Sequence, residues 1–279
     1  MRLEALTESF GVAVEDVDLK TLSDGAAQTL YKRFVDAGVM CIRKQTLDPD
    51  AFLTFARKLG EPIEQIYGQF NIPERPEIGL LTSEDTDSSG SGQRKIRGTS
   101  WHTDASYFEA PPKATMLFAE CVPASGGDTE FLSTAAAYAA LPTRLKNRIS
   151  KVQAVHNYQS SRSPRQLIAR SAAQVEQYAE GTLHPLARRN PDNARHAIYL
   201  NPIRIEYIDG LARDESDALL DELLEFCQSP HFYYRHCWYA GDVVIWDNRS
   251  ILHQANDDYD WRAEKRRLMR IMLAGERPV

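Results

Sequence analysis

Two histidines and one aspartate are candidate metal ligands in this sequence. His102 and Asp104 are separated by a single residue, and His253 lies far downstream. On an extended strand, residues i and i+2 point to the same face, so His102 and Asp104 could both contact one ion. Two imidazoles and one carboxylate on one face of Fe(II) leave positions open for a chelating cosubstrate and dioxygen. The pattern predicts an enzyme that uses iron and oxygen.

Neither part of this pattern is specific by itself. His102 and Asp104 also fit an exposed surface pair, since the chain has 7 histidines and many aspartates. His253 follows an apolar run at 243–246 that the polar residues 247–249 end, and a histidine in that place also fits a turn. The metal-site hypothesis therefore depends on the segments around these residues.

Length and composition limit the possible classes of protein. A chain of 279 residues fits one barrel or sandwich domain as well as two average domains. Hydrophobic residues make up 43% and charged residues 26%, as in ordinary globular proteins. The net charge of −6 argues against a nucleic-acid partner, because such domains usually display a basic face. The 4 cysteines show no Cys-x-x-Cys spacing, which favours reduced thiols.

The sequence gives no sign of a membrane or secreted protein. No segment approaches the roughly 18 to 20 uninterrupted apolar residues that a membrane helix needs. The N-terminal residues 1–8 contain no apolar stretch that could serve as a signal peptide. We therefore expect a cytoplasmic protein without a membrane partner.

Short β-rich runs predominate, and a few helices separate them. Helical spacing of apolar residues and capping signals predict helices at 23–38, 48–60, 133–141 and 214–226. Strands are predicted at 39–42, 114–122, 152–155, 196–200, 232–238, 243–246 and 268–273. Many short strands with covering helices favour a mixed α/β, mainly β fold of the jelly-roll type, a double-stranded β-helix. Because no linker divides the chain, we expect a single domain over residues 1–279.

One polar segment interrupts this pattern just before His102. Residues 83–100 are rich in serine, glycine and charged side chains and cannot pack a core, which predicts a mobile loop. Both a lid over a site and a plain connector fit this composition.

Four motifs, in a fixed order, resemble those of one known family. They are Trp101-His102-Thr103-Asp104, Ser125-Gly126-Gly127-Asp128-Thr129, Trp246-Asp247-Asn248-Arg249 with His253, and the closing segment from Arg266 to Arg270. Over nearly the whole chain, the sequence resembles the taurine/2,4-dichlorophenoxyacetate dioxygenase family of Fe(II)- and 2-oxoglutarate-dependent oxygenases. The resemblance implies Fe(II), 2-oxoglutarate and O2 as the reacting partners. It also implies that His102, Asp104 and His253 bind the metal.

The resemblance implies a site for 2-oxoglutarate as well. A guanidinium suits the distal carboxylate of 2-oxoglutarate, because its planar fork can donate two parallel hydrogen bonds. The family pattern assigns this role to Arg266, with Arg267 as the alternative register, and assigns a supporting hydroxyl to Thr129. The implied reaction converts 2-oxoglutarate to succinate and CO2 while it hydroxylates a substrate. Hydroxylation beside a heteroatom would then cleave the substrate.

A small anionic substrate is expected on the same grounds. Arg270 matches the arginine that holds the sulfonate in taurine dioxygenase, so we expect a sulfonate, an alkyl sulfate or a carboxylate. Tyr67, Tyr107 and Arg204 are further candidates for substrate binding. Gly98 stands where taurine dioxygenase has an asparagine, which argues against taurine itself.

Two other functions fit the sequence. One is a biosynthetic hydroxylase or desaturase of an amino-acid-like substrate on the same scaffold. The other is a protein that binds a metal or small ligand without catalysis. Members of the family are commonly oligomeric, so the resemblance also implies a homo-oligomer.

Overall fold

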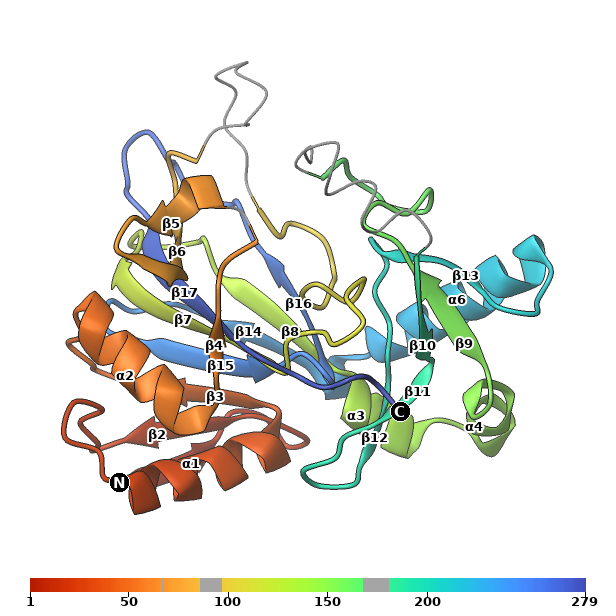
Figure 1. Ribbon diagram of the computed structural model, residues 1–279, viewed down its shortest axis with the longest axis horizontal. Coiled ribbons are helices and arrows are strands. Elements are labelled where there is room, and N and C mark those ends of the chain that lie inside the picture. The colour runs from red at the N-terminus through yellow and green to blue at the C-terminus, as the bar shows by residue number, and fades with distance from the viewer. Residues whose placement is uncertain (67, 86–96, 168–180) are drawn as a thin grey trace.

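A nine-stranded sheet forms the centre of the protein (Figure 1). The computed structural model describes residues 1–66, 68–85, 97–167 and 181–279. In spatial order the strands are β1 (Arg2–Ala5), β2 (Val12–Glu15), β3 (Val39–Ile42), β15 (Val243–Asp247), β7 (Ala114–Cys121), β17 (Arg267–Leu273), β6 (Arg75–Thr82) and β5 (Asn71–Ile72), with β4 (Pro62–Ile63) paired to β17. Neighbouring strands are antiparallel except β2 and β3, which are parallel.

A smaller antiparallel sheet packs against the central one. Its strands, in order, are β14 (Tyr233–His236), β8 (Thr129–Ser133) and β16 (Ile251–Ala255). The ring of Phe131 on β8 lies 5.6 Å, between centroids, from that of Trp246 on β15. Both side chains belong to one buried cluster that lies between the two sheets.

Two helices cover the outer face of the central sheet. In α1 (Asp24–Ala37), the side chain of Ser23 accepts a hydrogen bond from Ala26 N. In α2 (Pro49–Leu59), the Asp48 side chain accepts one from Ala51 N at 2.8 Å. Both caps satisfy backbone N–H groups that a helix leaves unpaired at its first turn. Both helices were predicted from the sequence, at 23–38 and 48–60.

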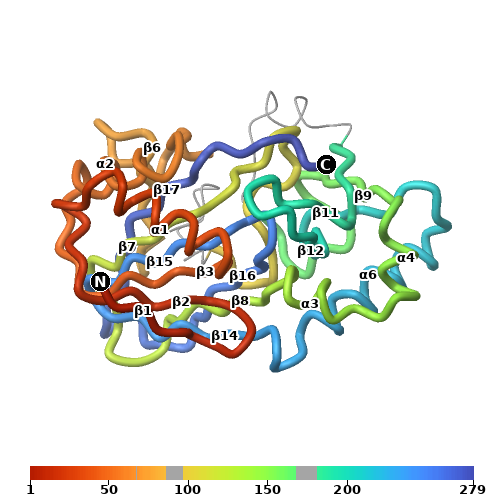
Figure 2. The backbone as a smooth tube through the Cα atoms, turned by 90° about the horizontal axis from the view of Figure 1, so that it is seen from below, coloured from red at the N-terminus to blue at the C-terminus, as the bar shows by residue number. Residues whose placement is uncertain are grey.

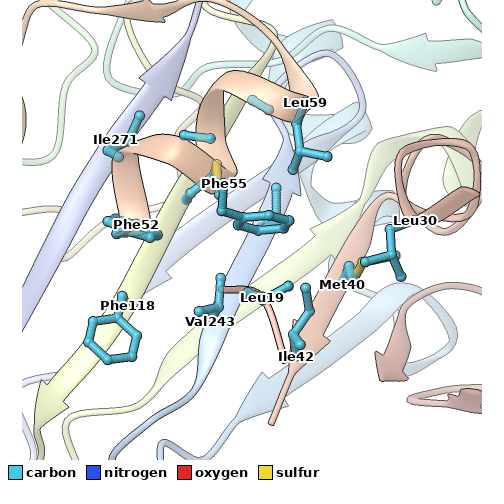
Figure 3. Close-up of a cluster of buried hydrophobic side chains, with 14 of the residues drawn as sticks. Leu19, Leu30, Met40, Ile42, Phe52, Phe55, Leu59, Phe118, Val243 and Ile271 are labelled. Carbon is cyan, nitrogen blue, oxygen red and sulfur yellow. The ribbon is translucent and has the colours of Figure 1, made fainter. Parts of the chain in front are cut away.

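Helix α2 buries an apolar stripe against the strands below it (Figure 3). The rings of Phe52 on α2 and Phe118 on β7 lie 6.0 Å apart between centroids. Phe55 packs in the same buried cluster as Val243 on β15 and Ile271 on β17. This packing holds β7, β15 and β17 in place, and these are the strands that form one wall of the site described below.

The remaining elements lie at the other end of the molecule (Figure 2). They are the helices α3 (Thr134–Ala140), α4 (Thr143–Ile149) and α6 (Arg213–Cys227), the sheet β10 (Thr182–Pro185), β9 (Gln153–His156) and β13 (Ile205–Ile208), and the pair β11 (Ala187–Arg189) and β12 (His196–Ile198). Leu219 and Leu223 of α6 are fully buried in this part of the protein. A short 3-10 turn at Pro230–Phe232 directly precedes β14, and another at Gly68–Phe70 lies beside β6 of the central sheet.

The prediction of a mixed, mainly β fold with covering helices is confirmed. Three strands that carry or adjoin the site, β6, β8 and β16, were not predicted, because their apolar residues neither alternate regularly nor form a long run. Most of the predicted loop at 83–100 lies outside the described residues. Among the helices of the described residues, none is both long and apolar enough to cross a membrane.

Candidate active site

His102 and His253 face each other across an isolated β-bridge. His102 N donates to His253 O at 3.1 Å, and His253 N donates to His102 O at 2.8 Å. Our prediction that His102 and Asp104 share an extended strand is wrong, because the chain turns from Asp104 onward and Ala105 has a φ of 46°. His253 lies within β16 and not in a turn after a strand.

The three predicted ligands nevertheless converge. One ligand atom from each of His102, Asp104 and His253 lies within 4.8 Å of the other two. Asp104 Oδ2 is 3.8 Å from His253 Nε2. The Nδ1 of His102 lies 2.7 Å from Ser100 O and donates a hydrogen bond to it. Nε2 is then unprotonated and can bind a metal. Two imidazoles and a carboxylate in this arrangement fit a divalent transition metal.

Burial and neighbouring charged groups keep these side chains in the charge states that metal binding needs. Burial and the neighbouring His253 hold the pKa of His102 well below its usual range. Burial lowers the pKa of His253 to about 4. For Asp104, burial favours the neutral acid, but Arg270 and the two histidines outweigh it and lower the pKa of the carboxyl. At neutral pH the site therefore presents neutral imidazoles and an ionised carboxylate.

Asp104 is held by groups from the central sheet. Thr115 on β7 donates from Oγ1 to Asp104 Oδ2 at 2.6 Å. Arg270 on β17 donates from Nη2 to Asp104 Oδ1 at 2.7 Å. The side chain of Asn248 donates to Thr115 Oγ1 at 2.9 Å and so orients the threonine. Hydrogen bonds behind a ligand fix its orientation and commonly tune the metal that it binds.

The ligand cluster opens into a cavity of about 140 Å³. Besides the three ligands, its lining combines aliphatic and aromatic side chains with arginines. The apolar members are Ile66, Leu81, Ala105, Leu117, Leu167, Ile203, Trp246, Ala255 and Tyr259, and the arginines are Arg97, Arg165, Arg204, Arg266 and Arg270. An apolar cavity with a few convergent charged groups is typical of a site for a small molecule.

Arg266 and Thr129 lie together in this cavity, and Arg267 does not. Arg266 Nε donates to Gly127 O at 3.0 Å, and no carboxylate of the described residues forms an ion pair with its guanidinium. Arg267 points outward and pairs with Glu120 at 2.7 Å. Arg266 directly precedes β17, and adjacent residues of an extended chain point to opposite faces, which accounts for the two directions. Burial lowers the pKa of Arg266.

Comparisons with known proteins fit this geometry. The family model described as "Taurine catabolism dioxygenase TauD, TfdA family" matches residues 2–272. The chain belongs to the TauD/TfdA family. The prediction of a 2-oxoglutarate-dependent dioxygenase is therefore confirmed, because the named relatives are alpha-ketoglutarate-dependent dioxygenases over most of the chain.

Three relatives illustrate the family. An (S)-phenoxypropionate/alpha-ketoglutarate-dioxygenase of Sphingobium herbicidovorans is 32% identical over 95% of this chain and 91% of its own length. An alpha-ketoglutarate-dependent sulfate ester dioxygenase of Pseudomonas putida is 33% identical over 96% of this chain and 88% of its own. The crystal structure of AAD-2 with Mn(II) and N-oxalylglycine superposes with a TM-score of 0.83 at 25% identity, over 99% of this chain and 98% of that one.

Of the residues predicted to bind substrate in this TauD/TfdA family member, two arginines line the cavity and one tyrosine lies behind its lining. Arg270 lines the cavity, but it forms an ion pair with Asp104. Arg204 also lines the cavity. Tyr107 is 1% exposed and lies behind the lining, where its ring packs against Arg204. Tyr67 lies outside the described residues.

Three residues that support the site were not singled out from the sequence. Thr115 and Arg165 stand at no spacing from the ligands that marks them, and Trp238 lies in an aromatic run. Arg165 Nε donates to Ser100 Oγ at 2.7 Å, beside the carbonyl that orients His102. Trp238 Nε1 donates to Thr129 Oγ1 at 3.0 Å. By contrast, Asn248, which orients Thr115, lies in one of the four TauD/TfdA motifs that the sequence contains.

Proposed function

We propose that this TauD/TfdA family member uses Fe(II) and 2-oxoglutarate to hydroxylate a small organic anion. One observation carries the proposal. The His102, Asp104 and His253 cluster shares a single cavity with Arg266, whose guanidinium has no carboxylate partner among the described residues. A ligand with its own carboxylate would supply the missing partner while its other end reaches the metal ligands.

The metal would be held by His102, Asp104 and His253. When bound, Fe(II) would supply the activation of dioxygen that couples decarboxylation of 2-oxoglutarate to oxidation of a C–H bond. The protein keeps His102 Nε2 free by engaging Nδ1 with Ser100 O. It keeps Asp104 ionised and oriented through Thr115 and Arg270.

The cosubstrate would lie between the metal ligands and Arg266. A planar guanidinium holds a carboxylate with two hydrogen bonds, and Thr129 Oγ1 can add a third because Trp238 already donates to it and leaves its own proton free. Leu81, Leu117 and Trp246 line the same cavity. Their apolar surfaces exclude water, which strengthens the charged contacts.

The primary substrate is proposed to be a sulfonate, an alkyl sulfate or an aryloxyalkanoate. Two of the relatives are named for a phenoxypropionate and for a sulfate ester. The excess of arginines over carboxylates in the cavity supports an anion here. Hydroxylation of the carbon that bears the ether or ester oxygen would give an unstable product that breaks the C–O bond.

We also propose that residues 1–279 form one catalytic unit with double-stranded β-helix topology. The antiparallel sheet β14–β8–β16 packs against the central sheet, and strands of both sheets line the cavity. The family match from residue 2 to residue 272 supports a single unit.

Succinate formation tests the proposed function. Purified protein with Fe(II), ascorbate and 2-oxoglutarate would be screened against sulfonates, alkyl sulfates, aryloxyalkanoates and amino acids. We expect one of the three anion classes to raise succinate formation above the rate without substrate. A protein that makes no succinate under any condition, coupled or uncoupled, would refute the proposed function, and a response to amino acids alone would refute the substrate class.

A further inference from the structure

Arg204 lines the cavity and, like Arg266, has no carboxylate partner among the described residues. Arg97 pairs with Asp85 at 2.6 Å, Arg270 pairs with Asp104 at 2.7 Å, and Arg165 donates to Ser100 Oγ at 2.7 Å. In the proposed function, Arg266 binds the carboxylate of 2-oxoglutarate. The positive charge of Arg204 remains without an assigned partner.

The guanidinium of Arg204 is fixed between two aromatic rings. Its central carbon lies 4.7 Å from the ring centroid of Tyr107 and 4.7 Å from that of Tyr158. It also donates from Nη1 to the backbone carbonyl of Tyr158. Cations over tyrosine faces are stabilised by the ring quadrupole, more so where water is excluded. The rings therefore hold the group in place, but they do not neutralise its charge.

The side chain of Arg204 is only 8% exposed, and its Nε has no hydrogen-bond partner within the described part of the chain. A buried charge without a counter-charge is costly. A protein tolerates such a group where a ligand supplies the missing charge. Since Arg204 lines the same cavity as the metal ligands, that ligand would lie within reach of the reacting centre.

We propose that Arg204 is the receptor for the anionic group of the primary substrate. This inference rests on the proposed function and assigns its specificity to one residue. The carboxylate, sulfonate or sulfate of the substrate would meet the guanidinium fork. The apolar part of the substrate would lie along Ala105 and Ile203, which line the same cavity.

Arg270, the residue that the family resemblance favoured, is already engaged. Its Nη2 donates to Asp104 Oδ1 at 2.7 Å, and its Nη1 donates to Gln65 Oε1 at 3.2 Å. A substrate anion at Arg270 would have to share this guanidinium with a metal ligand. The geometry thus gives Arg270 the task of positioning Asp104 and leaves substrate recognition to Arg204.

The test compares R204Q and R204K with wild type, with R267Q as the matched control. Arg267 is an exposed arginine that pairs with Glu120 outside the cavity. Each protein is loaded with Mn(II) and N-oxalylglycine, and binding of 2-phenoxypropionate, hexyl sulfate and hexanesulfonate is measured by calorimetry. The KM for 2-oxoglutarate is measured in parallel from uncoupled succinate formation with Fe(II).

We expect wild type to bind at least one of the three anions and R204Q to bind it about 10- to 100-fold more weakly, as for loss of a hydrogen bond to a charged group. R204K should lose less affinity, because it keeps the charge and loses only the planar fork. The KM for 2-oxoglutarate should stay within about twofold in both variants, and R267Q should match wild type throughout.

Three results would overturn the inference. They are unchanged anion affinity in R204Q, an equal rise in the KM for 2-oxoglutarate, and failure of wild type to bind any of the anions. In the last case, uncoupled succinate formation would show that the dioxygenase function survives although the substrate assignment has failed. If R204Q does not fold, Tyr158→Leu is the second variant, because it removes one ring and keeps the charge of Arg204. It should weaken binding of the anion without changing the KM for 2-oxoglutarate.

Discussion

His102 and His253 are joined by two backbone hydrogen bonds, of 3.1 and 2.8 Å, and their ring centroids lie 4.1 Å apart. The main chain therefore sets the distance between the two candidate imidazole ligands. Because these bonds do not involve side chains, either histidine can be replaced without moving the backbone of the other. The ligand set can then be tested one residue at a time.

His102→Ala should abolish Fe(II) binding and turnover while the protein stays folded. The change removes one of three donor groups and leaves both backbone bonds to His253 in place. Metal content after dialysis against Fe(II), together with succinate formation, gives the measurement. His231→Ala, at an exposed position, serves as the control. Wild-type turnover in His102→Ala would show that the site assignment is wrong.

Arg266→Gln should raise the KM for 2-oxoglutarate by about tenfold or more, since a hydrogen bond to a charged group contributes roughly 1.5–3 kcal/mol. Arg267→Gln should leave the KM unchanged, because Arg267 lies outside the cavity and pairs with Glu120. Steady-state succinate formation at varied 2-oxoglutarate distinguishes the two. The opposite result would show that Arg267, and not Arg266, binds the distal carboxylate of 2-oxoglutarate.

Thr115→Val should weaken metal binding or activity by about 10- to 100-fold, as is usual for groups behind a metal ligand. The valine keeps the shape of the fully buried threonine but cannot donate to Asp104 Oδ2. Titration of the iron-free protein with Fe(II) under anaerobic conditions would measure the change. Thr29→Val on the exposed face of α1 should have no effect, and equal metal affinity in both variants would refute the role of Thr115.

Stability of the metal-free protein should fall as the pH is lowered through the range in which unfolded histidine titrates. Burial lowers the pKa of His184 from 6.5 to about 4. Between these values the unfolded chain binds a proton that the folded protein does not, so stability decreases with falling pH and the loss is complete near pH 4. The contribution of His184 is up to about 3 kcal/mol.

Urea unfolding at several pH values between 4 and 7.5 would measure this dependence. His184→Gln should flatten the slope, because it removes one group whose pKa differs between the two states. The exposed His231→Gln should keep the wild-type slope. Some slope should remain in His184→Gln, since burial also lowers the pKa of His156. Identical slopes in wild type and His184→Gln would contradict the prediction.

Sequence patterns predicted the parts of the fold that local physics determines. Helices α1 and α2 begin directly after Ser23 and Asp48 because those side chains cap the first turn. Strand β15 was predicted from its continuous apolar run, which fits its complete burial. Strand β16 was not, because its stability comes from pairing with β8, more than 100 residues earlier in the chain.

In the site, too, local residue types were predictive and long-range contacts were not. His102, Asp104 and His253 were predicted as ligands from residue types and the family motifs, and the structure brings them together. The turn after Asp104 was missed, because Ala105 with a φ of 46° carries no turn signal in its residue type. The support from Thr115 depends on which strand lies beside the site, which sequence spacing does not specify.

The origin of each ligand has a consequence for how a metal would act on the fold. Asp104 is bonded to Thr115 on β7 and Arg270 on β17, whereas His253 belongs to β16 in the smaller sheet. A bound metal would therefore act as a cross-link between the two sheets. Sliding of one sheet over the other would break a coordination bond, so loading with metal should slow any unfolding route that begins by separating them.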